Sequence, residues 1–589
     1  MPRFVINLDD AARHVAHVTL LLTDLAPGPH VLSLPTWQPG FYEIRDFSRH
    51  LFGMESREHD VPLALVKTEK NRWQFTSQGG PVEIRYQVYA FELTVYGSHL
   101  DASHAYWNGT NFFLTVDDDK NVPVDVQIEA PPGWQVSTGL DPVASDPFRF
   151  RAASYDVLYD CPVEVGTHRR RMFTVLDVPH EMAVWGYGNE DLDQLETDIT
   201  RIVESASRYF GGLPYSHYTF IFHVADGVGG LEHANSTTCG FSRTAFRPWA
   251  SYRRVLGLIA HEFVHLWNVK RIHPEGLGPF DYDHEATLEL LWTMEGITEY
   301  VTRLVLRRAN LITVEEFLDG LADDIRELEQ KPGRHIMSLA DASYNIFANR
   351  AQVFVEPNRA ISYYLKGCLV GMLLDLEIRR TTRHEQSLDD VLRLLMARYG
   401  AHGIGFPEAA YRATAEEVAG ASLALFWHRY VNGMEDISWD SWLEAVGLRL
   451  ERSLHDPDRR GNEASRLRPA WLGVEYQRVP TPIRLRAAFN PGPSAGLLYP
   501  DDEIVALDDI RVQKSEELEG RVRQRRPGDR ARIHVFRRGR LESVTVTLGQ
   551  APENRYRLAR RDDPRPEGRI GYERWLEGGW PEPSASALD

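Results

Sequence analysis

The spacing of apolar residues changes near residue 166, and this change limits the possible folds more strongly than any other feature. Before it, apolar and polar residues alternate as in half-buried strands, most clearly in PVEIRYQVYAFEL over 81–93. After it, apolar residues recur at helical spacing over 251–270, 285–308, 314–329, 359–381, 388–399 and 414–430. Together the two patterns predict a multidomain α+β protein that begins with an all-β domain.

The 589 residues divide into five parts on this basis. Residues 1–165 form an N-terminal β-rich domain without chemistry of its own, and 166–455 form a larger domain of a few strands followed by helices. The polar stretch 456–468 is a linker, and a domain of short strands follows over 469–549. Residues 550–589, rich in Arg, Pro and Gly, are a C-terminal tail that we expect to be partly extended.

Composition excludes several classes of protein. A net charge of −18 argues against a general nucleic-acid partner. No run reaches the roughly 18 apolar residues of a membrane span, so we expect no membrane partner either. The three cysteines are far apart, which argues against disulfides and Cys-based zinc sites. Acidic residues stand where a secretory signal has its apolar core. We therefore expect a cytoplasmic protein, or a periplasmic or secreted one if a leader precedes this sequence.

The stretch His261-Glu262-Phe-Val-His265 carries the chemistry. Its histidines are one helical turn apart on an amphipathic pattern, so both imidazoles can reach one ion. Zinc held in this way lowers the pKa of its water, and a neighbouring Glu such as Glu262 can accept the proton. The motif by itself leaves open a second reading, two structural histidines on a buried helix.

A third metal ligand must come from another element. The next helical stretch offers Glu295 and Glu299, one turn apart among apolar residues. One carboxylate can bind the metal while the other accepts the second ring N–H of a ligand histidine. The alternative for this pair is a solvated charged face. Four residues in or near the preceding loop are rival ligands: Asp281, Asp283, His284 and Glu289.

The segments HEFVHLWNVKR and LLWTMEGITEY resemble the gluzincin metallopeptidases, specifically the PDZ-bearing glycyl aminopeptidase family. The resemblance implies that His261, His265 and Glu295 bind one Zn²⁺ per chain and that Glu262 is the catalytic base. Glu299 is then the carboxylate that accepts the ring N–H of a ligand histidine. Aminopeptidases related to leukotriene A4 hydrolase have a shorter gap before the third ligand. The resemblance also implies a thermolysin-like catalytic domain with a helical bundle, placed between the N-terminal all-β domain and a C-terminal PDZ domain.

The stretch Gly229-Gly230-Leu-Glu232-His233 follows a predicted strand and resembles the Gly-Ala-Met-Glu-Asn element of those aminopeptidases. In that family the element lies along the substrate, and its Glu grips the free amine; His233 stands in place of the Asn. A Gly-Gly pair on an edge strand lets a substrate backbone approach, and Glu232 supplies the charge for an α-ammonium.

A further stretch, Tyr363-Tyr364-Leu-Lys366-Gly367, resembles the Tyr-x-Lys-Gly segment whose tyrosine stabilises the oxyanion. Aligning Lys366 and Gly367 assigns this catalytic role to Tyr364, because a phenol hydroxyl aimed at developing charge is a suitable donor. We expect Tyr363 to be a core residue.

The segment around Leu472-Gly473-Val474 resembles the carboxylate-binding loop of PDZ domains. Successive N–H groups in such a loop can bind a peptide C-terminus while the adjoining strand adds the peptide to a sheet edge. The alternative is a degenerate PDZ domain that only packs on the catalytic domain.

We therefore expect a zinc aminopeptidase acting on peptides with a free N-terminus, by attack of a zinc-bound water with Glu262 as general base. The family resemblance implies a preference for N-terminal Gly or Ala. Two alternatives stay open: a zinc endopeptidase with the same site, and a PDZ-type peptide-binding protein with a vestigial zinc site. An endopeptidase would cleave N-acetylated peptides as readily as free ones and would lose little on Glu232→Ala.

Overall fold

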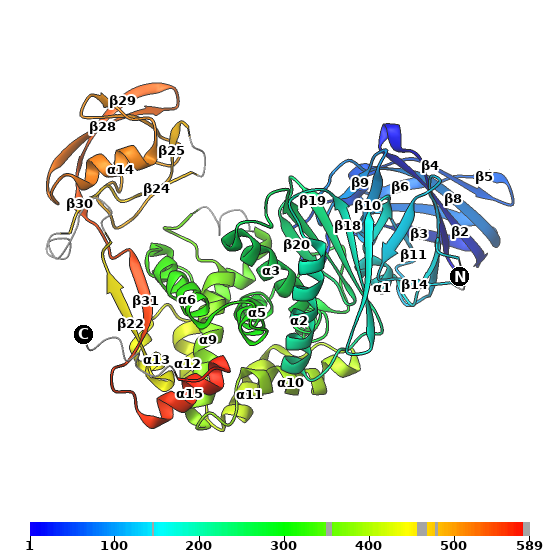
Figure 1. Ribbon diagram of the computed structural model, residues 1–589. Helices are drawn as coiled ribbons and strands as arrows, with labels where there is room; N and C mark the ends of the chain where they lie inside the picture. Colours follow the sequence, from blue (N-terminus) through cyan, green and yellow to red (C-terminus); the bar gives the residue numbers. More distant parts are fainter. Residues whose placement is uncertain (144–145, 349–355, 456–467, 478–480, 581–589) are drawn as a thin grey trace. The chain divides into compact units, whose positions relative to one another are not determined.

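The computed structural model describes residues 1–143, 146–348, 356–455, 468–477 and 481–580, which form two compact units (Figure 1). The first unit contains residues 1–287, 301–312 and 389–414, and the second contains 288–300, 313–388 and 415–589. All but the last residue of the predicted linker lies outside the described ranges. Within those ranges, no helix has both the length and the apolar character needed to span a membrane.

The first unit opens with the all-β domain that the alternating pattern predicts. Its largest sheet has eight strands in the order β14-β15-β12-β1-β2-β8-β4-β5, and two sheets of four have the orders β11-β3-β7-β6 and β13-β16-β10-β9. The strands are β1 (Arg3–Asp10), β2 (Val15–Leu25), β3 (Gly28–Ser33), β4 (Leu51–Glu58), β5 (Val61–Leu63), β6 (Val66–Glu69), β7 (Arg72–Ser77), β8 (Gly80–Tyr89), β9 (Ser98–Leu100), β10 (His104–Trp107), β11 (Thr115–Val116), β12 (Val124–Glu129), β13 (Gln135–Thr138), β14 (Asp141–Pro142), β15 (Arg149–Ala152) and β16 (Val163–Gly166). A short helix, α1 (Tyr155–Asp160), precedes β16.

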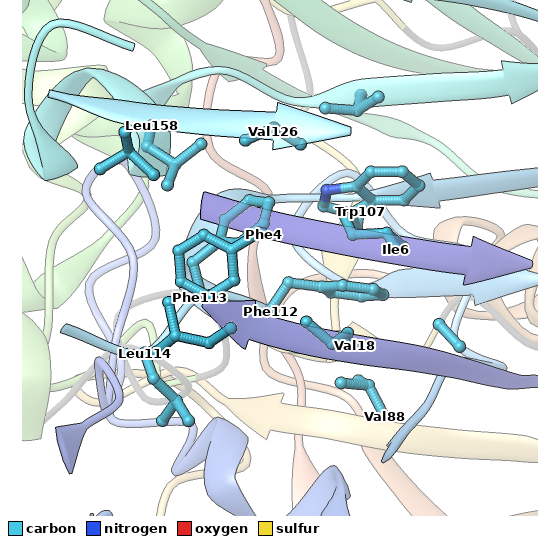
Figure 2. Close-up of a cluster of buried hydrophobic side chains, with 14 of the residues drawn as sticks. Phe4, Ile6, Val18, Val88, Trp107, Phe112, Phe113, Leu114, Val126 and Leu158 are labelled. Atoms are coloured by element: carbon cyan, nitrogen blue, oxygen red, sulfur yellow. The ribbon is translucent and has the colours of Figure 1, made fainter. Parts of the chain in front are cut away.

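Alternation along these strands builds the core of the domain. In β8 the four apolar positions from Val82 to Val88 are buried and the residues between them are at least partly exposed, as predicted. Facing side chains from several strands and from the turn at 112–114 fill the interior (Figure 2). The rings of Phe4 and Phe113, for example, meet edge to face with centroids 4.9 Å apart.

A five-stranded sheet in the order β17-β18-β19-β21-β20 follows in the same unit, with β20 at its edge. Its strands are β17 (Arg169–Val175), β18 (Val178–Gly186), β19 (Tyr218–Ala225), β20 (Gly229–Glu232) and β21 (Ser236–Ser242). Two helices accompany the sheet, α2 (Leu192–Phe210) and α3 (Trp249–Val264), and α3 packs against β20 and β21.

Helices follow, as the change of period predicts. They are α4 (Leu291–Met294), α5 (Gly296–Arg308), α6 (Val314–Glu329), α7 (Leu339–Tyr344), α9 (Tyr363–Thr381), α10 (Leu388–Arg398), α11 (Glu408–Ala419), α12 (Ala424–Phe426) and α13 (Trp439–Leu443). The capping box at the start of α6 is present, with Thr313 and Glu316 each accepting from the other's backbone N–H. The helix predicted over 414–430 is wrong in extent, because Gly420 takes a φ of +62° and ends α11 there.

The PDZ domain follows in the second unit, with α14 (Ser515–Arg523) beside a sheet in the order β24-β25-β26-β28-β29. Its strands are β23 (Ala470–Trp471), β24 (Val474–Tyr476), β25 (Ile483–Ala488), β26 (Glu503–Leu507), β27 (Ile510–Arg511), β28 (Arg530–Arg537), β29 (Arg540–Thr547) and β30 (Gly549–Gln550). These elements complete the predicted fold class: an all-β domain, a mixed domain with many helices, and a C-terminal domain with the predicted PDZ architecture.

The chain after the PDZ domain is not the extended tail that composition suggested. It forms β31 (Arg555–Arg560), which pairs with β22 (Leu448–Ser453), and then α15 (Pro566–Leu576). The physical reason is Trp575, which is fully buried and donates its indole N–H to the Tyr300 hydroxyl at 2.7 Å. One large aromatic residue provides the apolar burial that a count of Arg, Pro and Gly does not register.

Candidate active site

The HEFVH motif lies at the end of α3, on a helix as its spacing predicts. The His265 amide donates to the His261 carbonyl oxygen at 3.2 Å, so one turn separates the two histidines. Their Nε2 atoms lie 3.0 Å apart and their rings are nearly perpendicular. Both imidazoles therefore offer a nitrogen to the same point in space.

The tautomer of His265 suits a metal ligand. Its Nδ1 lies 2.9 Å from the carbonyl oxygen of Asn268. A carbonyl oxygen only accepts, so Nδ1 carries the ring proton and Nε2 presents its lone pair toward His261. Nitrogen donors arranged in this way fit a zinc ion, which proteins bind most often through neutral imidazoles and carboxylates.

The edge strand β20 brings the carboxylate of Glu232 close to that of Glu262 in α3. It pairs antiparallel with β21, from Gly229 opposite Gly240 to Glu232 opposite Thr237. One oxygen of Glu232, one of Glu262 and one ring nitrogen of His265 all lie within 4.8 Å of one another. All three side chains are buried. An edge strand, a helix end and two carboxylates thus converge within the first unit.

Gly230 lets the Glu262 side chain lie against β20. A Cβ at this position would be 2.1 Å from Glu262 Oε1 and 2.5 Å from its Cγ, which no real contact allows. The Gly-Gly pair was predicted to admit a substrate backbone. In the structure, the space above Gly230 is taken by the Glu262 side chain, whereas a Cβ at Gly229 would have only Val95 within 4 Å, at 3.8 Å.

The N-terminal β domain also contributes to this site, although its sequence shows no chemistry. Gly40, in a turn closed by the Phe41 amide donating to Gln38 at 3.0 Å, has a φ of +88°. A Cβ there would be 2.6 Å from Glu232 Oε1, so the turn lies directly against that carboxylate. The residues following Gly40 do not form a motif, and nothing in the sequence links this turn to Glu232.

Asp160 of α1 anchors the chain on both sides of the site. Its Oδ2 accepts from the Ala234 amide at 2.7 Å, just beyond β20, and its Oδ1 pairs with the Lys270 ammonium, just beyond the histidine motif. His233 Nδ1 lies 3.5 Å away. Although burial alone would raise the pKa of Asp160, Lys270 and His233 hold it down at about 2. The carboxylate is therefore ionised throughout the neutral range.

Three of the rival ligands have other roles in the first unit. Asp283 Oδ1 accepts from Asn71 at 2.7 Å, and its other oxygen pairs with Arg72 at 2.5 Å. Asp281 pairs with His284 at 2.9 Å, and that histidine side chain is 81% exposed. These partners lie in the N-terminal domain or in the loop itself, which disfavours all three as ligands.

Glu295 and Glu299 belong to α4 and α5, near the start of the second unit. Glu295 is buried at the break between the two helices, where one continuous helix over 285–308 was predicted. Glu299 is half-buried in α5, and its amide donates to the Glu295 carbonyl oxygen at 2.9 Å. The assignment of Glu295 as third ligand and of Glu299 as the group that orients a histidine stays a prediction.

Tyr364 lies in the first turn of α9. Gly296 packs so tightly on this helix that a Cβ there would lie 2.5 Å from the Cα of Gly367. This crossing joins the element that carries Glu295 to the one that carries Tyr364. Tyr363 is buried, as predicted for a core residue, while Tyr364 is half-buried.

The predicted carboxylate loop of the PDZ domain connects β23 to β24. Leu472 is fully buried, Gly473 has a φ of +76°, and Val474 begins β24 at the edge of its sheet. A groove of about 1160 Å³ borders β24 and α14, with Val474, Glu475, Glu519 and Arg523 among its lining residues. An open strand edge beside a helix is the arrangement that accepts a peptide as an added strand.

Comparison with known proteins agrees with this geometry. Family models match the peptidase M61 N-terminal domain at residues 3–167, the M61 glycyl aminopeptidase at 254–370 and a PDZ domain at 483–548. A search of curated proteins gives no match. Among solved structures, an aminopeptidase N family protein from Idiomarina loihiensis is 27% identical, with a TM-score of 0.90, over 98% of this chain and 100% of that one.

Two more distant structures are also similar. The M1 zinc metallopeptidase from Deinococcus radiodurans, solved as a variant, is 14% identical with a TM-score of 0.46, over 71% of this chain and 90% of that one. Yeast LTA4 hydrolase, in complex with bestatin, is 13% identical with a TM-score of 0.44, over 75% of this chain and 66% of that one. The three matches confirm the resemblance predicted from the motifs: the chain is a metallopeptidase whose N-terminal and catalytic parts are similar to those of the M61 glycyl aminopeptidases and whose C-terminal part contains a PDZ domain.

Proposed function

We propose that this metallopeptidase is a zinc-dependent aminopeptidase that removes N-terminal residues, preferentially Gly or Ala, from peptides. The observation that carries the proposal is the convergence of Glu232, Glu262 and His265 within 4.8 Å. A carboxylate for the substrate amine, a base and a metal ligand thus lie within the span of one aminoacyl residue. The matched description, glycyl aminopeptidase, supports the preference for a small first residue.

The ion would be held by His261 and His265, with Glu295 as the third ligand and Glu299 orienting a histidine. When bound, zinc lowers the pKa of a water and polarises the carbonyl under attack. The convergent Nε2 atoms and the proton fixed on His265 Nδ1 support this assignment.

Glu262 takes the proton from the attacking water and then passes it to the leaving amine. Its close contact with Gly230 restricts where the carboxylate can point. Tyr364 donates its hydroxyl to the oxyanion that forms at the former carbonyl.

Glu232 binds the α-ammonium of the substrate, whose backbone lies along the β20 edge. The Gly40 turn lies against the Glu232 carboxylate, and in this proposal it restricts the space for residues before the first one. This arrangement favours an aminopeptidase over an endopeptidase using the same ligands. The open β24 edge supports a second binding site, for a peptide C-terminus at the PDZ loop.

Hydrolysis of short glycyl and alanyl peptides with free or acetylated amines tests the proposal. We expect free peptides alone to be cleaved, chelator to abolish the activity, and zinc to restore it. Glu262→Gln should lower kcat by about 10²–10⁴-fold. Glu232→Gln should raise KM for free peptides by about 10–100-fold, because a charged hydrogen bond is lost.

Glu275→Gln is a matched control, because this exposed carboxylate lies in the same unit and is not among the residues proposed for the site. It should leave both constants unchanged. Equal cleavage of acetylated peptides, together with an inert Glu232→Gln, would establish an endopeptidase instead. Absence of hydrolysis in a zinc-loaded chain would leave peptide binding as its function.

A further inference from the structure

A second group of metal-ligand residues lies in the first unit, apart from the proposed peptidase residues. It consists of His104 in β10, Glu164 in β16, His168 just after β16, and His223 in β19. We call these four residues the buried histidine cluster. Their side chains are 0%, 0%, 0% and 4% exposed, respectively. The cluster lies where the sheet containing β10 and β16 meets the sheet containing β19.

Glu164 is at the centre of the cluster. Its Oε1 lies 2.9 Å from His104 Nδ1, and its Oε2 lies 3.0 Å from His223 Nε2. One ligand atom from each of these three residues lies within 4.8 Å of the others. Neighbouring ligands around a tetrahedral zinc ion with bonds of 2.0–2.1 Å are about 3.3 Å apart. The two contacts of Glu164, at 2.9 and 3.0 Å, differ from this spacing by only a few tenths of an ångström.

The hydrogen bonds around His168 determine where its proton lies. Ser137 donates its hydroxyl proton to Glu181 Oε1 at 2.5 Å, because a carboxylate only accepts. The Ser137 oxygen must then accept from His168 Nε2, which lies 2.8 Å away. Nε2 is therefore the protonated atom, and His168 Nδ1 carries a lone pair.

That lone pair faces another electron donor. His168 Nδ1 is buried, has no hydrogen-bond partner among the described residues, and lies 3.9 Å from Glu164 Oε1. A nitrogen lone pair and a carboxylate oxygen facing each other repel unless a cation or a proton donor lies between them. The gap of 3.9 Å is shorter than two zinc–ligand bonds of about 2.0 Å, so one ion can touch both atoms.

His104 can also turn its lone pair toward this point. Its other ring atom, Nε2, is buried and finds no hydrogen-bond partner in the part of the chain that the structure describes. Nδ1 donates to Glu164 Oε1, because a carboxylate only accepts, so an ion at this point would require the ring proton to move from Nδ1 to Nε2. The Trp185 ring stacks on the imidazole, with centroids 3.7 Å apart, and holds its plane in place.

We propose that the buried histidine cluster binds a second divalent transition-metal ion through His104, His168, His223 and Glu164. Three imidazoles and one carboxylate suit zinc, and four protein ligands without an open position are typical of a structural site. The ion would tie the β10 and β16 strands to β19 and would take no part in hydrolysis. The rival occupant is a water that donates one proton to His168 Nδ1 and the other to Glu164.

The test counts zinc per chain in the full-length protein by mass spectrometry after exhaustive dialysis. We expect two ions in the wild type, one in the His261→Ala/His265→Ala double variant, and none when Glu164→Gln is added to it. Adding Glu275→Gln to the double variant instead should leave one ion. A folded double variant that holds no zinc would overturn the proposal and leave the water as occupant.

The count also separates this proposal from the peptidase site. If only the peptidase site is wrong, the wild type holds one ion, which survives loss of His261 and His265. If only the second metal site is wrong, the wild type also holds one ion, but the double variant holds none.

Cobalt substitution avoids any change to the cluster itself, in case Glu164→Gln does not fold. Co²⁺ bound to the double variant should give the strong visible absorption of a four-coordinate site, and X-ray absorption should show three imidazoles. A weak, six-coordinate spectrum, or cobalt removed by dialysis, would contradict the proposal.

Discussion

At the scale of single residues, two glycines make room for the carboxylates of the site. Gly230 allows Glu262 to lie against β20, and Gly40 allows a turn of the β domain to lie against Glu232. At each glycine, a carboxylate oxygen lies closer than 3 Å to the position that a Cβ would occupy, so no side chain fits there. The positions of the proposed base, Glu262, and of the proposed amine-binding group, Glu232, therefore depend on the absence of two methyl groups.

We expect Gly230→Ala to abolish most peptidase activity without unfolding the chain. The new Cβ would displace the Glu262 side chain, which is flexible and can swing away at small cost to stability. The kcat of free glycyl peptides should fall about as far as in a general-base deletion, 10²–10⁴-fold, while zinc content stays the same.

Gly240→Ala provides the matched control in the same hairpin. Its Cβ would meet nothing closer than 3.4 Å, an ordinary contact. If both variants lose activity equally, hairpin distortion and not displacement of the base explains the loss.

Asp160 gives a prediction about acid stability. Its pKa is lowered to about 2 in the folded chain, against about 3.9 unfolded, so its contribution to stability is full above pH 4. That contribution, about 2 kcal/mol, should disappear as the pH falls from 4 to 2. Asp160→Asn should therefore lower the free energy of unfolding in urea at pH 7, and the difference from wild type should shrink below pH 4.

Asp226→Asn removes an exposed carboxylate near β20 and serves as the comparison. It should leave the urea midpoint unchanged at both pH values. A difference between Asp160→Asn and wild type that stays constant down to pH 2 would contradict the proposed ion pairing.

The motif residues could be predicted because their chemistry depends on local spacing. His261 and His265 are related by one helical turn, and Glu232 by its position on a short strand, so the sequence alone places each on its element. Gly40 and Asp160 could not be predicted in this way. They reach the site through tertiary contacts more than 70 residues away in the chain, and no local pattern records such contacts.

At the scale of elements, α4 and the start of α5 pack closely on α9 near Glu295 and Tyr364. Periodicity predicts helices on both sides of this crossing, but it does not show that the helix over 285–308 breaks at Glu295. The break lies beside Gly296, whose backbone touches Gly367. Helix–helix contact is a tertiary property, so a pattern within one segment cannot reveal it.

Gly296→Ala should destabilise the chain by about 2–3 kcal/mol, because the new methyl group meets backbone that cannot rotate away. Urea denaturation measures this change. Gly257→Ala in α3 is the control, since a Cβ there has open space and should stabilise the helix slightly. Equal midpoints for the two variants would show that the crossing can relax.

A buried lysine in α9 gives a prediction with the opposite pH dependence. Burial lowers the pKa of Lys366 to about 8, and its Nζ lies 3.5 Å from the Gly433 carbonyl oxygen. Below pH 8 the folded chain must hold a buried charge, and the penalty fades as the pH rises toward 10.4, the unfolded value.

Lys366→Met should therefore raise the melting temperature at pH 7, and the gain should shrink by pH 10. Lys331→Met, which removes a half-buried lysine paired with Glu327, should give no such gain. A benefit of Lys366→Met that does not change with pH would mean that packing and not charge is responsible.

At the scale of the whole molecule, the PDZ domain is an insertion between two paired strands. β22 leads into it and β31 leads out, with Ser453 directly opposite Arg555 (Figure 1). Glu329 of α6 holds both strands, through Arg452 at 2.7 Å and the Tyr556 hydroxyl at 2.6 Å. The chain then continues into α15 and buries Trp575.

Replacing residues 454–554 with an Asn-Gly turn should therefore leave a folded peptidase, because two-residue turns join antiparallel strands well. We expect unchanged kcat on short free peptides and loss of binding to peptides through their C-termini. Kinetics and calorimetry with the same peptide set measure both. An unfolded product would mean that the PDZ domain stabilises the helices it is attached to.

The order of the domains was predictable from composition and motifs. The pairing of the chain after the PDZ domain with the strand before it was not. The composition of the charged linker and the Arg-rich tail predicts extended chain without regular structure. In the tail, however, β31 pairs with a strand about 100 positions earlier. Strand pairing at that separation depends on which segments meet in the folded chain and leaves no local signature.

A domain that is inserted between two paired strands can be exchanged as one unit. Another domain can replace it through two junctions, after Ser453 and before Arg555, which lie opposite each other. The hydrolytic machinery would keep its covalent connections on both sides. Variation in the inserted domain can thus accumulate independently of variation in the peptidase residues.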